Sequence, residues 1–409
     1  MAPLAVGIAL SFAAAPLGAQ DFEAPPVLNA AQTVPAELRQ GTAWTLSDEV
    51  ISDGYVNQYV IDHEDGELVV QSEDLLAIRA HELEALAQLN EISRSQVFAD
   101  AAVEAAKSPF VFAKDMVTSP VATASGVVKG TGRFVRGIGR GLFGKKGEQE
   151  EGVVGATLGT AAAKRAFAEE LQIDPYAENE LLQARLNDMA WTAFAGGLSV
   201  SVASDVALGG TTAGTLITIG SFGGSMNALI YDKTPSELHD LNKGKLDGMD
   251  VSQGVTDSFL GHPLYSPTRK TYLVGALEQM EGVSGRGIFV DRAIATGTVP
   301  DAFLWQRMAE MMAAYHVNVE PASEVTALGA LPLIRTQDNK LIGVLPNDYL
   351  AWTEELAAEA EEAGLEAAGA GERGRELWFG GTVSPLAKQK LEEIGWTVLE
   401  GKGSELRLP

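Results

Sequence analysis

The sequence predicts an α+β protein that is predominantly helical, and three patterns lead to this fold class. An alternating stretch around Asp65–Gly66 is typical of a β-hairpin, because glycine accepts a positive φ in the turn. No glycine occurs between Gly66 and Gly126, and apolar residues over 72–106 recur at helical spacing, which indicates one long helix after the hairpin. Strand–helix–strand order over 376–399 predicts a parallel βαβ unit in a small C-terminal α/β domain.

The remaining elements follow along the chain. The prolines within residues 20–40 indicate a linker. Helix starts are expected at Asp174–Pro175, Thr234–Pro235 and Ser266–Pro267, because a capping side chain there precedes a proline. Later strands are expected at 317–319, 331–335, 341–345, 376–379 and 396–399, with helices at 348–366 and 385–394.

The length of 409 residues favours more than one domain, because single cores of that size are unusual. We found no internal repeat of the kind that builds solenoids. The predicted segments are a signal peptide (1–19), a linker (20–40), a β-hairpin with a long helix (41–106), a basic glycine-rich amphipathic segment (107–152), a helical domain (153–315) and a small α/β domain (316–409).

Composition excludes several classes of protein. A hydrophobic fraction of 46% excludes a disordered acidic polymer and a collagen-like fibre. The chain has no cysteine, which excludes disulfides, thiol nucleophiles, thiolate metal sites and a lipidated cysteine. A formal net charge of −25 argues against nucleic acid as a partner, because phosphate contacts need a basic surface.

The first residues predict export. Met1–Gln20 is uncharged, is apolar from Leu4 to Ala15 and ends in small residues, so we expect a signal peptide with cleavage after Ala19. We therefore expect the protein to lie in the periplasm or to be secreted into the medium. Peripheral attachment to the membrane is compatible with this location. An uncleaved membrane anchor is the alternative.

Charge is segregated along the chain. Residues 107–147 carry eight basic residues and one acid, a net charge of +7, which leaves −32 for the rest. Apolar residues and arginines fall on different faces of a helical projection, a pattern typical of contact with an anionic membrane surface. An acidic protein partner, docking on the chain's own acidic surface and a flexible linker are the alternatives. The residues expected to make the contact are Lys129, Arg133, Phe134, Arg136, Ile138, Arg140, Lys145 and Lys146.

Residues 189–231 carry a single charge, that of Asp205. The uncharged run from Val206 to Tyr231 is long enough to span a bilayer. About half of it is Thr, Ser, Gly and Asn, however, so we favour buried small-residue helices over a membrane-inserted hairpin.

No motif predicts catalytic residues, a metal site or a cofactor. The cluster Asp62–His63–Glu64–Asp65 holds potential metal ligands, but its place at a hairpin tip favours a solvated turn. The loops after two predicted strands offer one conventional ligand site, with Asp348, Thr382 and Ser384 as candidates. Ser384–Pro385 is also an ordinary helix start.

Two functions remain open. We favour a non-enzymatic envelope protein with a structural or interaction role, which contacts an anionic membrane surface or an acidic partner through the basic segment. The alternative is a small-ligand-binding protein or an enzyme that uses the C-terminal loops. In that case Asp348, Thr382 and Ser384 should converge on one concave pocket. The sequence predicts no oligomeric state.

Overall fold

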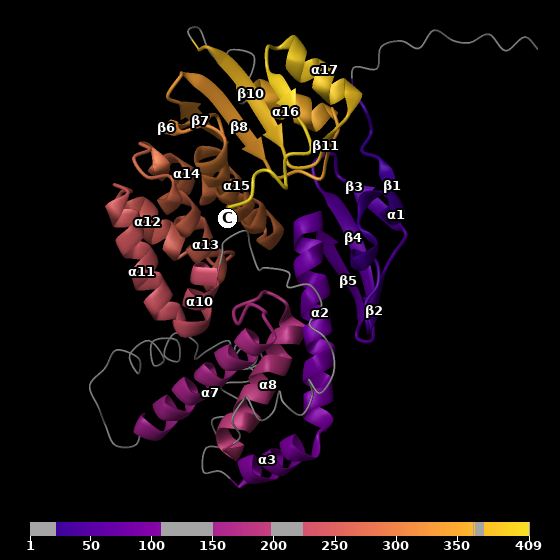
Figure 1. Cartoon of the computed structure of the whole chain (residues 1–409), viewed down its shortest axis with the longest axis vertical. Helices are drawn as coiled ribbons and strands as arrows, with labels where there is room; N and C mark the ends of the chain where they lie inside the picture. The colour runs from indigo at the N-terminus through magenta and orange to yellow at the C-terminus, as the bar shows by residue number, and fades with distance from the viewer. Residues whose placement is uncertain (1–21, 108–149, 198–223, 363, 365–371, 409) are drawn as a thin grey trace, which may run out of the picture.

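The computed structural model describes residues 22–107, 150–197, 224–362, 364 and 372–408 (Figure 1). The predicted signal peptide, and nearly all of the basic glycine-rich segment, lie outside the described residues. The fold is mixed α+β and predominantly helical, as the sequence predicts. An antiparallel sheet comes first, helices form the middle, and a mixed sheet with helices ends the chain (Figure 1).

The N-terminal sheet has five antiparallel strands arranged around β4. β4 pairs with β5 along one edge and with β3 and β2 along the other, while β1 pairs with β3. The predicted hairpin is confirmed, because β4 and β5 are joined at Glu64–Asp65 and Gly66 has a φ of +123°. The strands are β1 (Val27–Asn29), β2 (Trp44–Leu46), β3 (Glu49–Ser52), β4 (Asn57–His63) and β5 (Gly66–Gln71).

The prediction of a linker over 20–40 is wrong for the described part of that range. It contains strand β1, a short helix α1 (Ala30–Thr33) and a 3₁₀ turn η1 (Ala36–Leu38). Ala30 and Val34 are buried in the apolar cluster under the N-terminal sheet. Prolines between short elements therefore mark element boundaries here.

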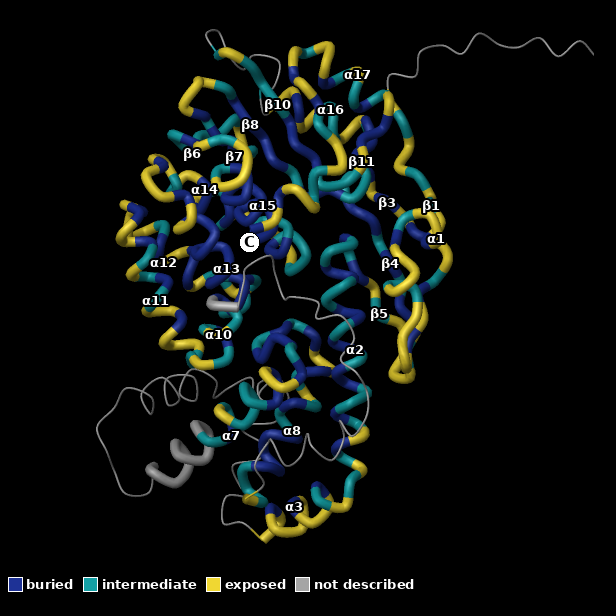
Figure 2. The backbone as a smooth tube through the Cα atoms, viewed as in Figure 1, coloured by how far each residue is buried: buried dark blue, intermediate teal, exposed yellow. Residues whose placement is uncertain are grey.

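Helix α2 (Glu73–Arg94) packs against the inner face of this sheet. In β4, Tyr59 and Ile61 are fully buried whereas Asp62 is exposed, the alternation of a strand with one buried face. The two buried residues form one apolar cluster with Leu76 and Leu83 of α2. Residues 64–67 at the tip of the β4–β5 hairpin are all exposed (Figure 2).

The single helix expected over 72–106 is divided at Ser95, so that prediction is wrong at one position. Helix α3 (Gln96–Ala106) begins after Ser95, whose ψ of 149° is not helical. The Ser95 side chain accepts a hydrogen bond from the backbone N–H of Phe98 at 3.2 Å and caps α3. Serine competes for backbone donors in this way, and the break allows α3 to pack against α8.

The middle of the chain is helical, as predicted. Helices α3 and α7 pack against α8, and α13 packs along α15 (Figure 1). Figure 2 shows that α13 and α15 are largely buried, whereas α11 and α12 have an exposed side. The helices are α7 (Glu150–Glu170), α8 (Glu180–Gly196), α10 (Gly224–Asp232), α11 (Pro235–Gly248), α12 (Gln253–Leu260), α13 (Pro267–Gln279), α14 (Arg286–Ala293) and α15 (Val299–Asn318).

Two predicted helix starts are confirmed. Thr234 forms a reciprocal capping box with Glu237 at the start of α11, and Ser266 caps α13. In both helices proline occupies the first helical position, where its missing N–H leaves no hydrogen bond unmade.

The helix start predicted at Asp174–Pro175 is wrong. Helix α8 begins only at Glu180, with Asn179 as its cap. The Asp174 carboxylate instead accepts a hydrogen bond from the backbone N–H of Tyr176 at 2.8 Å. The capping side chain thus closes a local turn, which is the competing use of an aspartate before proline.

The uncharged stretch 189–231 is described only in part. Met189, Ala190 and Ala193 are buried near the end of α8, as expected for a core helix. Residues 198–223 lie outside the described residues. Among the helices that are described, none is long and apolar enough to cross a membrane.

The C-terminal sheet has the strand order β12-β10-β8-β7-β6. β8, β10 and β12 run parallel to one another, whereas β7 is antiparallel to both β8 and β6. The predicted βαβ unit is confirmed as β10–α17–β12. The elements are β6 (Ala322–Leu328), β7 (Leu331–Thr336), β8 (Lys340–Leu345), β9 (Tyr349–Leu350), α16 (Glu354–Glu362), β10 (Gly374–Phe379), β11 (Thr382–Val383), α17 (Pro385–Glu393) and β12 (Thr397–Leu399).

Two predicted elements of this region are wrong. The strand expected over 317–319 belongs to the end of α15, because its valines continue a long apolar helix. The helix expected over 348–366 begins only at Glu354, because Tyr349–Leu350 forms strand β9 and pairs with β11.

Helix α15 connects the two sheets. Near its end the ring of Tyr315 meets the ring of Trp378 on β10 edge-on, with centroids 5.3 Å apart. Near its start Phe303 joins the apolar cluster of the N-terminal sheet. The carboxyl ends of β8 and β10, the start of α2 and one side of α15 therefore meet at one place.

Candidate functional site

A cavity of about 200 Å³ lies where these four elements meet. Its apolar wall includes Phe303, Leu304 and Met311 of α15. Its polar wall comes from the start of α2, the loops after β8 and β10, and the C-terminal tail. The tail residues Ser404 and Arg407 are exposed, so the cavity opens to solvent on that side. The polar lining consists of Ser72, Glu73, Asp74, Arg307, Asn347, Asp348, Gly380, Gly381, Gly403, Ser404 and Arg407.

Asp348 ties the two sheets together at this cavity. Its carboxylate accepts a hydrogen bond from the backbone N–H of Asn57 at 2.8 Å and another from that of Glu73 at 3.1 Å. Loss of solvent, with further contributions from the nearby carboxylates of Asp74 and Glu73, raises the pKa of Asp348 to about 7. One carboxylate from the C-terminal sheet therefore satisfies donors at the end of the β3–β4 turn and at the start of α2.

Two arginines from the C-terminal part of the chain hold Asp74 on α2. The Nε of Arg307 donates to Asp74 at 2.8 Å, and the Nη2 of Arg407 donates to its other oxygen at 3.3 Å. Arg307 also contacts Glu310 at 3.3 Å and donates to the carbonyl oxygen of Gly403 at 3.2 Å. Burial by itself would lower the pKa of Arg307, but Asp74 and Glu310 more than offset it and raise that pKa.

The loop after β10 needs glycine at Gly381. A Cβ there would lie 2.1 Å from the carbonyl oxygen of Asp348, closer than any side chain tolerates. The backbone N–H of Gly381 donates to the side chain of Asn347 at 3.3 Å. Glycine thus lets the loops after two parallel strands approach each other and form one wall of the cavity.

A chain of buried polar groups runs from the cavity toward α2 and α13. Gln306 donates to Glu310 at 2.8 Å and accepts from Arg269 at 3.3 Å. Arg269 donates to both oxygens of Glu178, at 2.6 and 2.7 Å. Glu178 in turn lies 3.4 Å from Arg79. Because buried charges are stable only when paired, each member depends on its neighbours.

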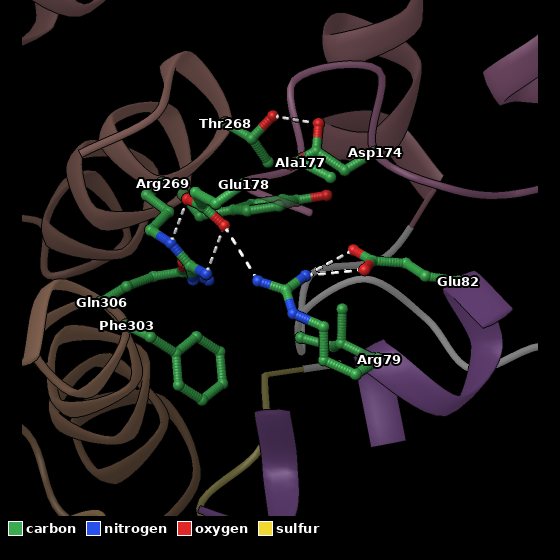
Figure 3. Close-up of a pocket in the computed structure, with 11 residues that line it drawn as sticks. Arg79, Glu82, Asp174, Ala177, Glu178, Thr268, Arg269, Phe303 and Gln306 are labelled. Atoms are coloured by element: carbon green, nitrogen blue, oxygen red, sulfur yellow. Dashed lines mark hydrogen bonds and ion pairs between the residues drawn. The ribbon is translucent and has the colours of Figure 1, made fainter. Parts of the chain in front are cut away.

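Figure 3 shows the far end of this network, where Arg79 lies between Glu178 and Glu82. Arg79 donates to the two oxygens of Glu82 at 2.6 and 2.7 Å, and Asn179 donates to Glu82 at 2.9 Å. A second pocket lies among these groups, but its volume is only about 20 Å³. That volume holds about one water molecule, so this end of the network is a packed junction.

Asp174 is a second carboxylate with a raised pKa at this junction. It accepts a hydrogen bond from the hydroxyl of Thr268 at 2.6 Å, and the two side chains point toward each other in Figure 3. Burial raises the pKa of Asp174 to about 7, although the bond from Thr268 opposes the shift. Its position in the packed junction indicates a role in holding the loop before α8 against α13.

The structure brings only one of the three predicted ligand residues into the cavity. Asp348 lines it, whereas Thr382 lies on β11, where its backbone N–H donates to the carbonyl oxygen of Asp348 at 3.0 Å. Ser384 caps α17, accepting from Ala387 at 3.0 Å, and its hydroxyl donates to Glu23. The three side chains therefore do not converge, and the helix-cap interpretation of Ser384 is confirmed.

The other predicted sites are the basic segment and the tip of the β4–β5 hairpin. Lys129, Arg133, Phe134, Arg136, Ile138, Arg140, Lys145 and Lys146 lie outside the described residues. The expected solvated turn at the hairpin tip is present, with the Nδ1 of His63 accepting from the backbone N–H of Asp65 at 3.2 Å. Among the described residues, no three histidine, aspartate or glutamate side chains gather closely enough to hold a metal ion.

Sequence reasoning missed the charged wall of the cavity. Asp74 is 233 residues from Arg307 and 333 residues from Arg407, so no local motif connects them. One signal was present in α15, where Arg307 and Glu310 stand three residues apart in the stretch 302–315, which is apolar except for these two residues and Gln306. A pair of opposite charges inside an apolar run indicates buried ionic partners.

Comparisons with protein-family models, with curated proteins and with solved structures found no match for this chain. The cavity and the charge pattern of the sequence are therefore the features that indicate a function.

Proposed function

We propose that this protein binds a small polar molecule in the cavity between α2, α15 and the loops after β8 and β10. The observation that carries the proposal is a cavity of about 200 Å³ at the carboxyl ends of parallel strands. Open α/β sheets commonly bind ligands outside the carboxyl ends of their strands. Here the crevice lies between the loops after β8 and β10 on one side and α2 and α15 on the other. For scale, an apolar cavity of about 150 Å³ accommodates benzene.

The lining supports recognition of an amphiphilic molecule. Phe303, Leu304 and Met311 offer apolar contact on one side, while Glu73 and Arg407 offer charged groups on the other. Small-molecule sites combine these two kinds of wall, with polar groups fixing the orientation of the ligand. Asp348 already accepts two backbone N–H groups, so its first role is to hold the cavity open between the sheets.

The backbone conformation of Ser72 also supports a ligand site in this cavity. Its φ of 74° and ψ of 147° fall in a region that residues other than glycine rarely adopt. Ser72 lines the cavity and caps α2, accepting from the backbone N–H of Leu75 at 3.3 Å. Backbone strain is concentrated at binding sites, where surrounding structure maintains it.

The test is a ligand-observed NMR screen of small polar fragments against the full chain and two tryptophan variants. Leu304→Trp fills the cavity from α15, and Val317→Trp is the matched control on an exposed position of the same helix. We expect fragments that bind the wild type and Val317→Trp but not Leu304→Trp. Equal binding to all three proteins, or no binding to any, would refute the proposal.

A second function is favoured by the charge segregation, which places a segment of +7 in a chain whose remainder carries −32. We propose that an exported envelope protein contacts an anionic membrane surface, or an acidic partner, through residues 107–147. Apolar burial and attraction to anionic lipids act together in such segments. The segment joins α3 to α7, which both pack against α8.

Vesicle sedimentation tests this second function. Replacing Arg133, Arg136 and Arg140 with glutamine should abolish co-sedimentation with phosphatidylglycerol vesicles, and so should high salt. The matched control replaces the exposed cations Lys243, Arg373 and Lys388 with glutamine. Unchanged sedimentation of the arginine variant would contradict the proposal, and fractionation of cells into periplasm, membrane and medium tests export.

A further inference from the structure

The charges that face the cavity do not balance. Its cations are Arg307 from α15 and Arg407 from the C-terminal tail, and both pair with Asp74. Arg307 is matched a second time, by Glu310. The remaining charged residues of the lining are Glu73 on α2 and Asp348 after β8, and no cation of the described residues lies within ion-pair distance of either.

Glu73 presents the less constrained carboxylate of these two. Its backbone N–H donates to Asp348, but no hydrogen bond from the described residues reaches its side chain. Burial, with a smaller contribution from Asp74, raises the pKa of Glu73, while Arg407 opposes the shift. The Glu73 carboxylate is therefore partly desolvated, and among the described residues it has neither an ion-pair partner nor a hydrogen-bond donor.

Asp348 has hydrogen-bond partners, but they are neutral. Both of its bonds come from backbone N–H groups, which leave its negative charge uncompensated. Each carboxylate oxygen has two acceptor positions, so Asp348 keeps acceptor capacity after those two bonds. The polar wall of the cavity thus offers two carboxylates, while both of its arginines pair with Asp74.

We infer that the ligand of this cavity is a small organic amine, with its ammonium group against Glu73 and Asp348 and its carbon body against Phe303, Leu304 and Met311. This inference rests on the proposed ligand-binding function. An ammonium has three donors and no acceptor, which suits two carboxylates that need donors and charge. An anion would instead face both carboxylates, with Arg407 already engaged by Asp74.

The pH dependence of binding follows from the same groups. The pKa of Asp348 is about 7, and an alkylammonium with a lysine-like pKa of about 10.4 remains charged over the same range. Protonation of Asp348 removes one of the two charges that hold the amine. Affinity for the amine should therefore increase as pH rises from 6 to 8.

The inference is tested with three probes that share one carbon body: butylammonium, 1-butanol and butyrate. Dissociation constants are measured by ligand-observed NMR at pH 8 on the full chain. We expect butylammonium to bind about tenfold more tightly than 1-butanol, the effect of one charge-assisted hydrogen bond, and butyrate to bind least.

Two variants locate the binding. Glu73→Gln keeps the shape of the side chain and should weaken butylammonium about tenfold without changing 1-butanol. The matched control is Glu67→Gln on the exposed face of β5. Arg407→Gln removes a competing cation at the opening, so it should leave butylammonium binding unchanged or tighter.

The outcomes separate the inference from the proposed function. Binding of 1-butanol or butyrate as tight as that of butylammonium, abolished by Leu304→Trp, would overturn the amine while retaining a small-molecule cavity. Weaker butylammonium binding in Arg407→Gln would also overturn it, because an amine gains nothing from that cation. If no probe shows saturable binding to the wild type, both the inference and the proposed function fail.

Discussion

The carboxylate of Glu178 accepts two hydrogen bonds from the guanidinium of Arg269, at 2.6 and 2.7 Å, in a bidentate arrangement. The same carboxylate lies 3.4 Å from Arg79. Burial would raise the pKa of Glu178, but the two arginines more than offset it and hold that pKa below its usual range. One side chain thus connects the loop before α8 with α13 and α2, segments more than ninety residues apart in the sequence.

Removing this carboxylate should destabilise the fold strongly. Glu178→Ala leaves Arg269 without its bidentate partner, and among the described residues it leaves Arg79 with Glu82 as its remaining ion-pair partner. Breaking a buried ion pair from one side costs about 3–5 kcal/mol, because an uncompensated charge remains buried. Urea denaturation measures the free energy of unfolding, with exposed Glu281→Ala as the control. A loss similar to that of the control would show that the network contributes little.

Asp174 should make the protein less stable as pH rises from about 4 to 7. Its pKa is raised from 3.8 to about 7, so between these values the folded state binds a proton that the unfolded chain has released. Its contribution is fully favourable below pH 4 and is lost as pH passes 7. Because Asp174→Asn stays neutral, its stability relative to wild type should increase over this window by a few kcal/mol.

Thermal denaturation at pH 4, 5.5 and 7 measures this difference. Asp257→Asn, an exposed position on α12, controls for the general effect of charge. A constant difference between Asp174→Asn and wild type across the series would show that Asp174 is ionised throughout. The pKa of Asp348 is raised as well, so the Asp174→Asn variant should keep the part of the pH dependence that comes from Asp348.

The parts of the fold that were predicted from the sequence depend on local chemistry. The hairpin at Asp65–Gly66 and the capping box at Thr234 are decided by residues within four positions of one another. The βαβ unit over 376–399 follows from the order of its local signals, a short strand, a helix start at Ser384–Pro385 and a second short strand. Local signals of this kind act in the isolated segment as they do in the folded protein.

Other features depend on partners that are distant in sequence. Ser95 fits the interior of a helix by periodicity, and the break there brings α3 against α8. Asp174 resembles a helix cap, but its carboxylate closes a turn and binds Thr268, 94 residues away. The cavity could be predicted only in part. The position of Asp348 after a strand identifies it from the sequence, but no motif marks Arg307 or Arg407 as lining residues.

Two small substitutions of Ser72 should change the free energy of unfolding in opposite directions. Its φ of 74° with ψ of 147° costs about 1–3 kcal/mol in a residue with a Cβ. Ser72→Gly removes that strain. Against this gain stand a loss of a few tenths of a kcal/mol at the helix cap and a cost of about 0.4–1 kcal/mol, because glycine raises the entropy of the unfolded chain. We expect a net gain of about 1 kcal/mol.

Ser72→Ala keeps the strain and loses the hydrogen bond to Leu75, so it should cost about 0.5–2 kcal/mol. Urea denaturation of the two variants beside wild type measures both signs. The comparison is informative because alanine and glycine remove the same hydroxyl and differ only in the Cβ. If both variants lose stability equally, the Cβ carries no strain at this position, and the backbone of the cavity wall is relaxed.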